Sequence, residues 1–231
     1  MMVGIIASTR LEAETIIKQL KKTEKICIQQ KMFYAGLFGE HSSAAICICG
    51  VGKTNAAHGA TILIERFNPD ILFNIGVAGA YPSSGLRIGD VAIAEKEIYG
   101  DEGLKIKDGF YTMSALSLPL VSLPHTRYFN EFPMSIPEGF GDFPHRGNFI
   151  TVSTCTGTAE EAKERSERFN ALCENMEGAA VAHVCLLCGV PGSEIRGISN
   201  IIEDRELGPL NKSDILAAAE SVQRFFLETL I

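Results

Sequence analysis

Short apolar runs bounded by glycine, proline or charged residues recur along this chain, and each has the length of a buried β-strand. The first begins at Val3, and three further runs follow close together before Gly50, with a turn predicted at residues 39–41. The runs that predict strands are residues 3–7, 25–29, 32–38, 43–49, 70–76, 90–98, 147–153 and 194–199.

Other segments place their apolar residues at helical spacing. The clearest follows Gly50-Val51-Gly52, and it ends at Asn68-Pro69 because the residue before a proline disfavours helical backbone. The pattern Thr158-x-x-Glu161 is that of a capping box and opens another helix. The predicted helices are residues 11–20, a helix through residues 56–67, the helix after Thr158, residues 176–187, and a last helix capped by Ser213.

Strands that alternate with helices predict a single α/β layered domain over residues 1–231. The three consecutive early strands favour a mixed sheet over a purely parallel one. Residues 100–148 break the pattern, since they hold five of the nine prolines and many aromatic side chains. We expect long loops with one short helix in this segment, covering a site rather than linking two domains.

Composition and charge narrow the possible functions. Apolar residues make up 46% of the chain and charged residues 21%, which is typical of a globular protein. The net charge of −7 disfavours partners such as nucleic acid or a membrane surface, because both require a basic face. No apolar run reaches the length of a membrane span, and the first residues lack the basic region of a signal peptide.

The cysteines and histidines point to a protein without a metal. Seven cysteines, several of them inside apolar runs, favour free thiols in a reducing, cytoplasmic compartment. Cys185-x-x-Cys188 has the spacing of a redox or metal pair, but no second pair accompanies it. The five histidines are scattered, so a metal site is not expected.

Two strand ends are candidates for a ligand site, because ligands of open α/β sheets bind beyond the carboxyl ends of strands. One apolar strand ends in Asn74-Ile75-Gly76-Val77-Ala78-Gly79-Ala80, whose glycines allow the backbone to approach a ligand closely. Another strand ends in Arg196-Gly197-Ile198-Ser199-Asn200. On spacing alone, a tight strand-to-loop turn explains the first segment about as well as a ligand site does. A surface turn explains the second segment about as well as a ligand site does.

Two carboxylates are the other candidates. Glu177 begins an otherwise apolar helix, and burial of its charge requires a partner. That partner is either the positive end of the helix or two neighbouring hydroxyl groups, such as those of a ribose. Glu12 follows the first strand, where it either complements a helix dipole or acts as a general base toward water.

These segments together resemble the nucleoside phosphorylase and nucleosidase superfamily, in particular its purine nucleosidases, which include methylthioadenosine/adenosylhomocysteine nucleosidase and futalosine hydrolase. The resemblance implies a phosphorylase/hydrolase-like fold, a three-layer α/β/α sandwich with a mixed, curved central sheet. It also implies no cofactor and a homodimer or higher homo-oligomer. The segments that carry it are Gly4-Ile5-Ile6-Ala7 with Glu12, Gly50-Val51-Gly52-Lys53, Gly76-Val77-Ala78-Gly79, Asn175-Met176-Glu177-Gly178-Ala179-Ala180 and Ile198-Ser199-Asn200.

The resemblance assigns a role to three residues. It implies that Glu177 accepts hydrogen bonds from the ribose 2′- and 3′-hydroxyls, that Glu12 activates the attacking water, and that Asn200 contacts the departing base at N7. A wider set is implied to line the sugar and the base: Ala78, Gly79, Thr154, Cys155, Thr156, Asn175, Met176 and Ser199.

One departure from the wider family separates hydrolysis from phosphorolysis. Phosphorylases hold phosphate with arginines, because a guanidinium group suits a phosphate dianion. Hexameric phosphorylases carry one shortly before the glycine turn, whereas residues 70–75 of this chain contain no arginine. Water is therefore the expected nucleophile.

A second departure concerns the purine. Adenine-releasing nucleosidases resemble this chain but end the strand with Ser-Asp, whereas this chain has Ser199-Asn200. The amide of Asn200 cannot protonate N7, but it can donate to the oxygen of a 6-oxopurine. Futalosine hydrolase shows a similar Ser-Asn ending, and residues 97–103 also resemble its segment there.

The resulting expectation is hydrolysis of the N-glycosidic bond of futalosine, a step of menaquinone biosynthesis that releases hypoxanthine. The alternatives are a methylthioadenosine/adenosylhomocysteine nucleosidase, a purine nucleoside phosphorylase, and a catalytically silent purine-binding protein. The aromatic loops of residues 110–149 are expected to house the 5′ arm of the substrate. Four side chains are candidates to pair with its carboxylate: His125, Arg127, His145 and Arg146.

Overall fold

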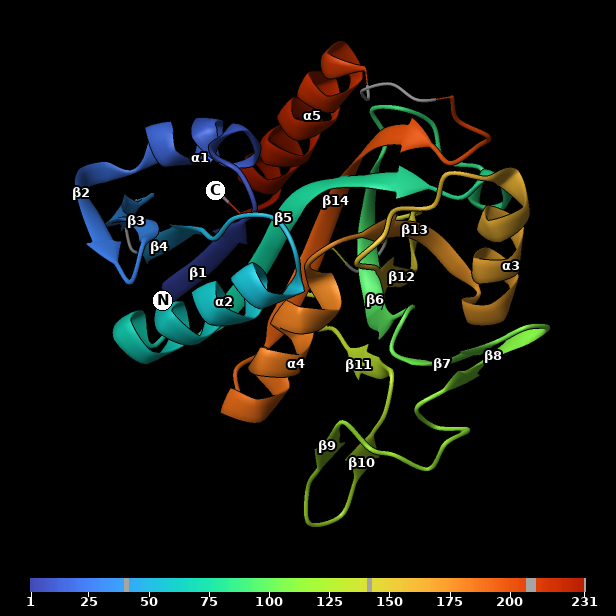
Figure 1. Cartoon of the computed structure of the whole chain (residues 1–231). Helices are drawn as coiled ribbons and strands as arrows, with labels where there is room; N and C mark the ends of the chain where they lie inside the picture. The colour runs from blue at the N-terminus through green and yellow to red at the C-terminus, as the bar shows by residue number, and fades with distance from the viewer. Residues whose placement is uncertain (40–41, 141–142, 207–210, 231) are drawn as a thin grey trace.

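A large mixed sheet forms the centre of the computed structural model, which describes residues 1–39, 42–140, 143–206 and 211–230 (Figure 1). Its strands, in spatial order, are β11 (Glu131–Pro133), β6 (Val91–Tyr99), β12 (Arg146–Thr151), β13 (Ala171–Asn175), β5 (Ile71–Ala80), β1 (Met2–Ala7), β4 (Ser42–Ile48), β3 (Lys31–Phe38) and β2 (Lys21–Ile28). A further strand, β14 (Gly192–Ile201), pairs with both β5 and β6.

The double pairing of β14 curves the sheet. Strands β6, β12, β13 and β5 are neighbours in turn, so β14 closes these five strands into a ring. Strand β1 pairs in parallel with β4 and β5, while β3 runs antiparallel to β2 and β4. The expectation of a mixed, curved central sheet is confirmed.

Helices cover both faces of the sheet and produce the expected three layers (Figure 1). Helices α2 (Lys53–Phe67) and α4 (Gly178–Cys188) pack together in one core cluster with residues such as Ile6 and Phe149. Helices α1 (Glu14–Gln19) and α5 (Lys212–Leu230) lie on the other face, where Phe226 meets Phe73 edge to face at 5.0 Å. Helix α3 (Ala159–Phe169) packs beside β13.

Local signals set most helix ends. The last residue of α2 is followed by Asn68 in left-handed backbone, and Thr158 accepts a hydrogen bond from the Glu161 amide at the start of α3. The predicted cap of α5 was wrong by two residues: the Asn211 side chain accepts the Ser213 amide at 3.0 Å, so Asn211 is the capping residue. Residues 40–41 of the predicted turn lie outside the described residues.

Residues 100–148 differ from the expectation. The described part of this segment has no helix, and its elements are the short strands β7 (Gly103–Ile106), β8 (Gly109–Thr112), β9 (Val121–Ser122), β10 (Arg127–Tyr128) and β11. β7 pairs with β8 and β9 with β10 as two small antiparallel hairpins. Turn residues and prolines divide this segment into stretches of only a few residues. None of these stretches is long enough for apolar residues to repeat at helical spacing.

Two boundaries near the strand ends were also missed. Strand β13 was not predicted, because Ala171–Asn175 is short and ends in two polar residues. Helix α4 begins at Gly178 rather than at residue 176, since Glu177 is its N-cap. This difference matters because it places Met176 and Glu177 in the connection, where side chains can face a ligand.

Candidate active site

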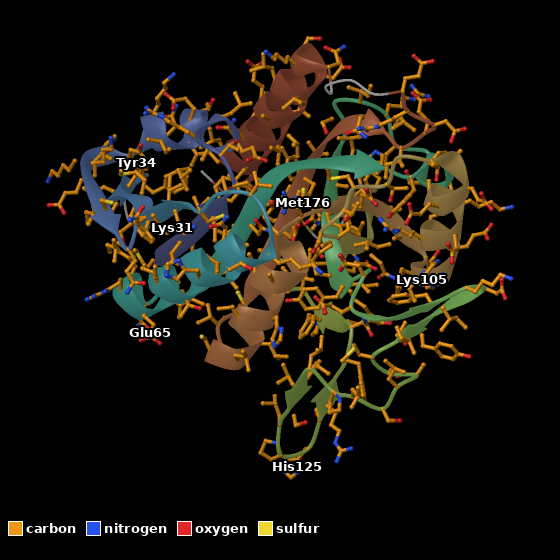
Figure 2. The ribbon with its side chains drawn as sticks, viewed as in Figure 1. Lys31, Tyr34, Glu65, Lys105, His125 and Met176 are labelled. Atoms are coloured by element: carbon orange, nitrogen blue, oxygen red, sulfur yellow. The ribbon has the colours of Figure 1, made fainter. Side chains whose placement is uncertain are left out.

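A cavity of about 320 Å³ lies at the ends of β1, β5, β13 and β14 and beside the segments that follow some of them. Figure 2 labels Met176, one of its lining residues, near the middle of the molecule. The lining is Ser8, Thr9, Leu11, Glu12, Val51, Val77, Ala78, Gly79, Cys155, Glu174, Asn175, Met176, Glu177, Ser199, Asn200 and Ile215. Nine of the eleven residues expected at the site therefore surround one space.

Glu12 is the last residue of a short 3-10 helix (Arg10–Glu12) that follows β1, and only 5% of its surface is exposed. One carboxylate oxygen accepts the Thr9 amide and hydroxyl, each at 2.8 Å, and the other accepts the Val77 amide at 3.0 Å. Burial raises the pKa of Glu12, while the charge of Arg196 and these hydrogen bonds oppose that shift. A carboxylate held in this way is fixed in position and prepared to take a proton.

Glu177 lines the same cavity and is the N-cap residue of α4, but its side chain does not cap the helix. Its Oε1 atom accepts the Gly52 amide at 2.9 Å, and its Oε2 atom lies 3.6 Å from the Arg196 guanidinium. The helix amides of Glu177 and Gly178 bond instead to the Asn175 side chain, at 2.9 and 2.7 Å. Since Asn175 satisfies the helix start, the carboxylate of Glu177 remains available to bind a pair of hydroxyl groups.

Asn200 lies near the end of β14 in the same cavity as the two glutamates. The Ser199 hydroxyl lies 3.0 Å from Asn200 Oδ1, to which it donates, and 3.2 Å from the Ala78 carbonyl. A Cβ at Gly79 would lie only 2.9 Å from Asn200 Nδ2, so the glycine makes room for this amide. With Oδ1 bound to Ser199, the NH2 group of Asn200 lies beside Gly79 and is available as a hydrogen-bond donor.

Arg196 is the residue whose role the sequence left most open, because its segment suited a surface turn. The structure buries it completely on β14, with Nε donating to Glu194 at 2.7 Å and Nη1 lying 3.3 Å from the Val77 carbonyl. Burial lowers the pKa of Arg196, but the charges of Glu194, Glu177 and Glu12 outweigh it and raise the pKa. A permanently charged guanidinium therefore lies beneath both glutamates.

The glycine turn has a different reason from the one expected. A Cβ at Gly76 would collide with Nη1 of Arg196 and with Oε1 of Glu12. Gly76 is therefore small because two protein side chains meet against the backbone there, and Gly79 because Asn200 does. The turn shapes the site through its neighbours and not only through a close approach to a ligand.

The segment after β12 contributes less than expected. Cys155 lines the cavity, whereas Thr154 and Thr156 do not belong to its lining. Thr156 is buried and gives both its amide and its hydroxyl to Glu174, at 2.7 and 2.5 Å. Tyr81 also donates to Glu174, at 2.8 Å. The resemblance-based role of Thr154 and Thr156 at the edge of the base is not supported by this placement.

The loops expected to cover the site do not reach it. No residue of 100–148 lies among the described residues that line the cavity. His125 stands at the far end of the β9–β10 hairpin, well away from Met176 in Figure 2, and Arg146 pairs with Glu95 at 2.9 Å. The lining instead includes the apolar side chains of Leu11, Val51 and Ile215.

The charges around the cavity have one sign. Glu12, Glu174 and Glu177 line it, and none of the described lining residues is lysine, arginine or histidine. Arg196 lies behind this surface and is already bound to carboxylates. A phosphate dianion would meet net repulsion here, whereas a neutral water molecule would not.

Sequence reasoning also missed Glu97 and Glu194, which are both fully buried. One signal was present: Glu194 and Arg196 are two residues apart on a strand, so opposite charges share one face of an otherwise apolar run. For Glu97 no such local partner exists, because its contacts come from β12, β13 and β14.

The fold and this site define an α/β sandwich with a site of the kind found in enzymes. The chain belongs to the phosphorylase superfamily, whose family model matches residues 2–230. It is 30% identical to a 5′-methylthioadenosine/S-adenosylhomocysteine nucleosidase of Maridesulfovibrio salexigens, over 96% of each chain. It is 35% identical to a futalosine hydrolase of Thermus thermophilus, over 78% of this chain and 79% of the relative.

Solved structures agree with the fold. A 5′-methylthioadenosine/S-adenosylhomocysteine nucleosidase of Neisseria meningitidis, in complex with methylthio-immucillin-A, superposes with a TM-score of 0.82. The match covers 99% of this chain and 98% of that one at 20% identity. In the described part of the chain, no helix is long and apolar enough to cross a membrane.

Proposed function

We propose that this protein is a purine nucleosidase that hydrolyses the N-glycosidic bond of futalosine, releasing hypoxanthine and dehypoxanthine futalosine. The observation that carries the proposal is the cavity shared by Glu12, Glu177 and Asn200, with the Asn200 amide directed by Ser199. A relative named as a nucleosidase, which matches 96% of the chain, supports the reaction class, and the relative named as futalosine hydrolase supports the substrate.

The proposed reaction begins with the grip on the sugar. Glu177 accepts hydrogen bonds from the two ribose hydroxyls, and Met176 lies beside it in the lining. As the bond to the base lengthens, the sugar becomes an oxocarbenium-like cation. The carboxylates of Glu177 and Glu12 stabilise that positive charge, and they do so more strongly in the transition state than in the bound substrate.

Glu12 is the proposed general base. Its side chain lines the cavity, and a water held in the cavity beside it would donate to the carboxylate. The proton moves from water to Glu12 as the oxygen attacks C1′, and the electrons of the broken N-glycosidic bond move to the purine. The purine leaves as an anion and takes up a proton from solvent to become neutral hypoxanthine. The absence of cationic side chains from the described lining supports water over phosphate as the nucleophile.

Asn200 is the proposed determinant of the base. Hypoxanthine presents two acceptors on the edge that carries N7 and O6, whereas adenine presents an acceptor and an amino donor. An amide whose oxygen is bound to Ser199 offers donors only, which matches the 6-oxopurine. An amino group facing these donors would leave buried polar atoms unpaired, and such mismatches are costly.

A second candidate is a methylthioadenosine/adenosylhomocysteine nucleosidase. It is favoured by the relative of that name from M. salexigens, which matches 96% of the chain. The apolar side chains Leu11, Val51 and Ile215 in the lining also suit a thioether at the 5′ position. This alternative differs from the main proposal in the base released.

The deciding experiment incubates the purified protein with futalosine, inosine and methylthioadenosine, each with and without phosphate, and identifies the released base by chromatography. We expect hypoxanthine from futalosine at a rate that phosphate does not change. Faster release of adenine from methylthioadenosine would favour the second candidate. Turnover that requires phosphate would identify a phosphorylase, and tight binding without turnover would indicate a binding protein.

A further inference from the structure

Two buried carboxyl groups lie side by side beneath the candidate site, and the proposed reaction does not use them directly. Glu97 on β6 and Glu194 on β14 both have no exposed surface, and neither lines the cavity. Two ionised carboxylates in contact inside a protein repel each other and lose their hydration. The chain therefore needs a physical reason to hold them together.

The position of Gly178 shows how close the two groups are. A Cβ on Gly178 would collide with both Glu97 Oε1 and Glu194 Oε2, so these two oxygens face the same small space under the first turn of α4. The other oxygen of each group already has a donor. Thr151 donates to Glu97 Oε2 at 2.7 Å, and Arg196 Nε donates to Glu194 Oε1 at 2.7 Å.

One hydrogen-bond donor is missing from this cluster. Glu194 Oε2 is buried and has no donor among the described residues. Glu97 Oε1 accepts the Asn175 side-chain amide at 2.6 Å. A single proton on Glu97 Oε1, directed at Glu194 Oε2, supplies the missing donor and leaves every carboxyl oxygen of the cluster with a partner.

We propose that Glu97 and Glu194 share one proton, and that this acid–carboxylate pair positions Arg196 and Asn175 beneath the ribose-binding glutamate. Glu194 holds the Nε edge of Arg196, whose Nη1 atom faces Glu177 at 3.6 Å. Glu97 holds the amide of Asn175, whose oxygen fixes the backbone of Glu177 and Gly178. The pair thus secures two of the partners that place Glu177, and the Gly52 amide is a third.

The surrounding charges agree with one proton on the pair. Burial, followed by repulsion from Glu194, raises the pKa of Glu97 well above its usual value; a hydrogen bond with Glu194 adds to this, while Thr151 and Arg196 oppose it. Burial also raises the pKa of the Cys173 thiol well above its usual value, so this neighbour is neutral. The titratable or charged groups that interact with the pair are Cys173 on β13, Tyr99 on β6, Cys185 on α4 and Arg196 on β14. Arg196 in turn interacts with Glu177 and Glu12 at the cavity.

The shared proton predicts a pH dependence of stability with a definite sign. The folded protein holds this proton more tightly than the unfolded chain, so the free energy of unfolding falls as pH rises above the usual carboxyl value of 4.5. Glu97→Gln and Glu194→Gln both abolish the shared proton and should lose this part of the slope. The matched control is Glu95→Gln, on the same strand but exposed, which should keep the wild-type slope.

The measurement is the urea midpoint between about pH 5 and 8 for the wild type and the three variants. Infrared difference spectra provide a second reading, since a protonated carboxyl group has a C=O stretching band that a carboxylate lacks. We expect the band to be lost in both Glu97→Gln and Glu194→Gln and kept in Glu95→Gln. Equal slopes and unchanged bands in all four proteins would overturn the proposal.

A further variant covers the case in which neither glutamine variant folds. Glu12, which lines the cavity, is a further buried carboxyl group with a raised pKa, so Glu12→Gln removes its contribution to the band. The acid band at neutral pH should persist in Glu12→Gln, and its absence would contradict the shared proton.

The positioning of Arg196 by Glu194 is tested separately, by enzyme kinetics. This test rests on the proposed function. Glu194→Ala should lower kcat/KM by about tenfold or more, and Glu194→Gln should restore most of it because its amide oxygen still accepts from Arg196. Equal losses in both variants would contradict positioning through Arg196. If no nucleoside is turned over but the infrared band is present, the proposed function fails while the shared proton stands.

Discussion

Individual residues in this protein acquire their chemistry from neighbours distant in sequence. Glu12 is buried against Val77 and near Arg196, Glu177 against Gly52 and Arg196, and the Asn200 amide lies against Gly79. In each case the protein holds a polar group that also lines the cavity. These contacts fix the orientation of each group toward a substrate, which is how a site is organised before binding.

At the residue scale, the first prediction concerns Glu12. Because burial raises its pKa, the base is ionised only above the usual carboxyl range, and kcat should fall as pH drops through a midpoint above 4.5. Glu12→Gln should lower kcat about 10²–10⁴-fold with little change in ligand affinity. Initial rates and ligand binding measured across pH test both statements, and an equal loss of binding and turnover would contradict the role as a base.

A second prediction at this scale concerns Asn200. Asn200→Asp supplies an acid that can protonate N7 and accept from an amino group, so preference should move toward adenine nucleosides. The ratio of kcat/KM for methylthioadenosine to that for inosine should rise about tenfold or more. Asn200→Ala serves as the control that removes the contact without replacing it. An unchanged preference in the aspartate variant would show that another group selects the base.

Elements meet in this fold through small residues as much as through large apolar ones. Strand β14 carries the site residues on one side, and α5 packs directly on its backbone at Gly197. A Cβ at Gly197 would overlap the backbone carbonyl oxygen of Ala218. Because a helix backbone cannot give way as a flexible side chain can, the separation of β14 and α5 depends on this glycine.

At the element scale, Gly197→Ala should destabilise the protein by about 1–3 kcal/mol or more, the cost of an overpacked contact. Gly157→Ala is a matched control, since nothing lies within 4 Å of the added Cβ. The urea midpoint of both variants measures the difference. Similar midpoints would mean that α5 shifts without cost, contrary to the tight contact with β14.

On the scale of the whole molecule, the layers divide the seven cysteines into two groups. Cys47, Cys49, Cys173 and Cys185 are buried, whereas Cys27, Cys155 and Cys188 are exposed. Burial raises the pKa of Cys49 to about 12 and that of Cys185 to about 12, so these thiols are protonated at neutral pH. Their reactivity therefore reports on the integrity of the entire core.

A brief treatment of the native protein with a thiol reagent should modify the three exposed cysteines, and the four buried ones only after unfolding. Cys155 alone among the exposed cysteines lines the cavity, so hypoxanthine should protect it while Cys27 remains reactive. Mass spectrometry of peptides reads each site separately. Equal labelling of Cys155 with and without hypoxanthine would contradict its place in the binding cavity.

The sequence by itself determined most of the long helices and core strands, the mixed sheet and the superfamily. These follow from local patterns, since strand and helix periodicity and short motifs such as Asn175-Met176-Glu177-Gly178 depend on neighbours along the chain. The superfamily membership is confirmed, while the homo-oligomer, the cytoplasmic location and the futalosine substrate remain predictions.

Only the tertiary structure decided which charges meet. Glu97 meets Glu194 and Arg196 because β14 pairs with β6, and no local pattern records a contact between residues so far apart in the chain. The same holds for residues 100–148, whose hairpins lie away from the cavity although their composition suggested a cover. Strand pairing brings distant residues into contact and buries them. Hydrogen bonds between the buried polar groups are then stronger than they would be in water, because the dielectric constant of the interior is low.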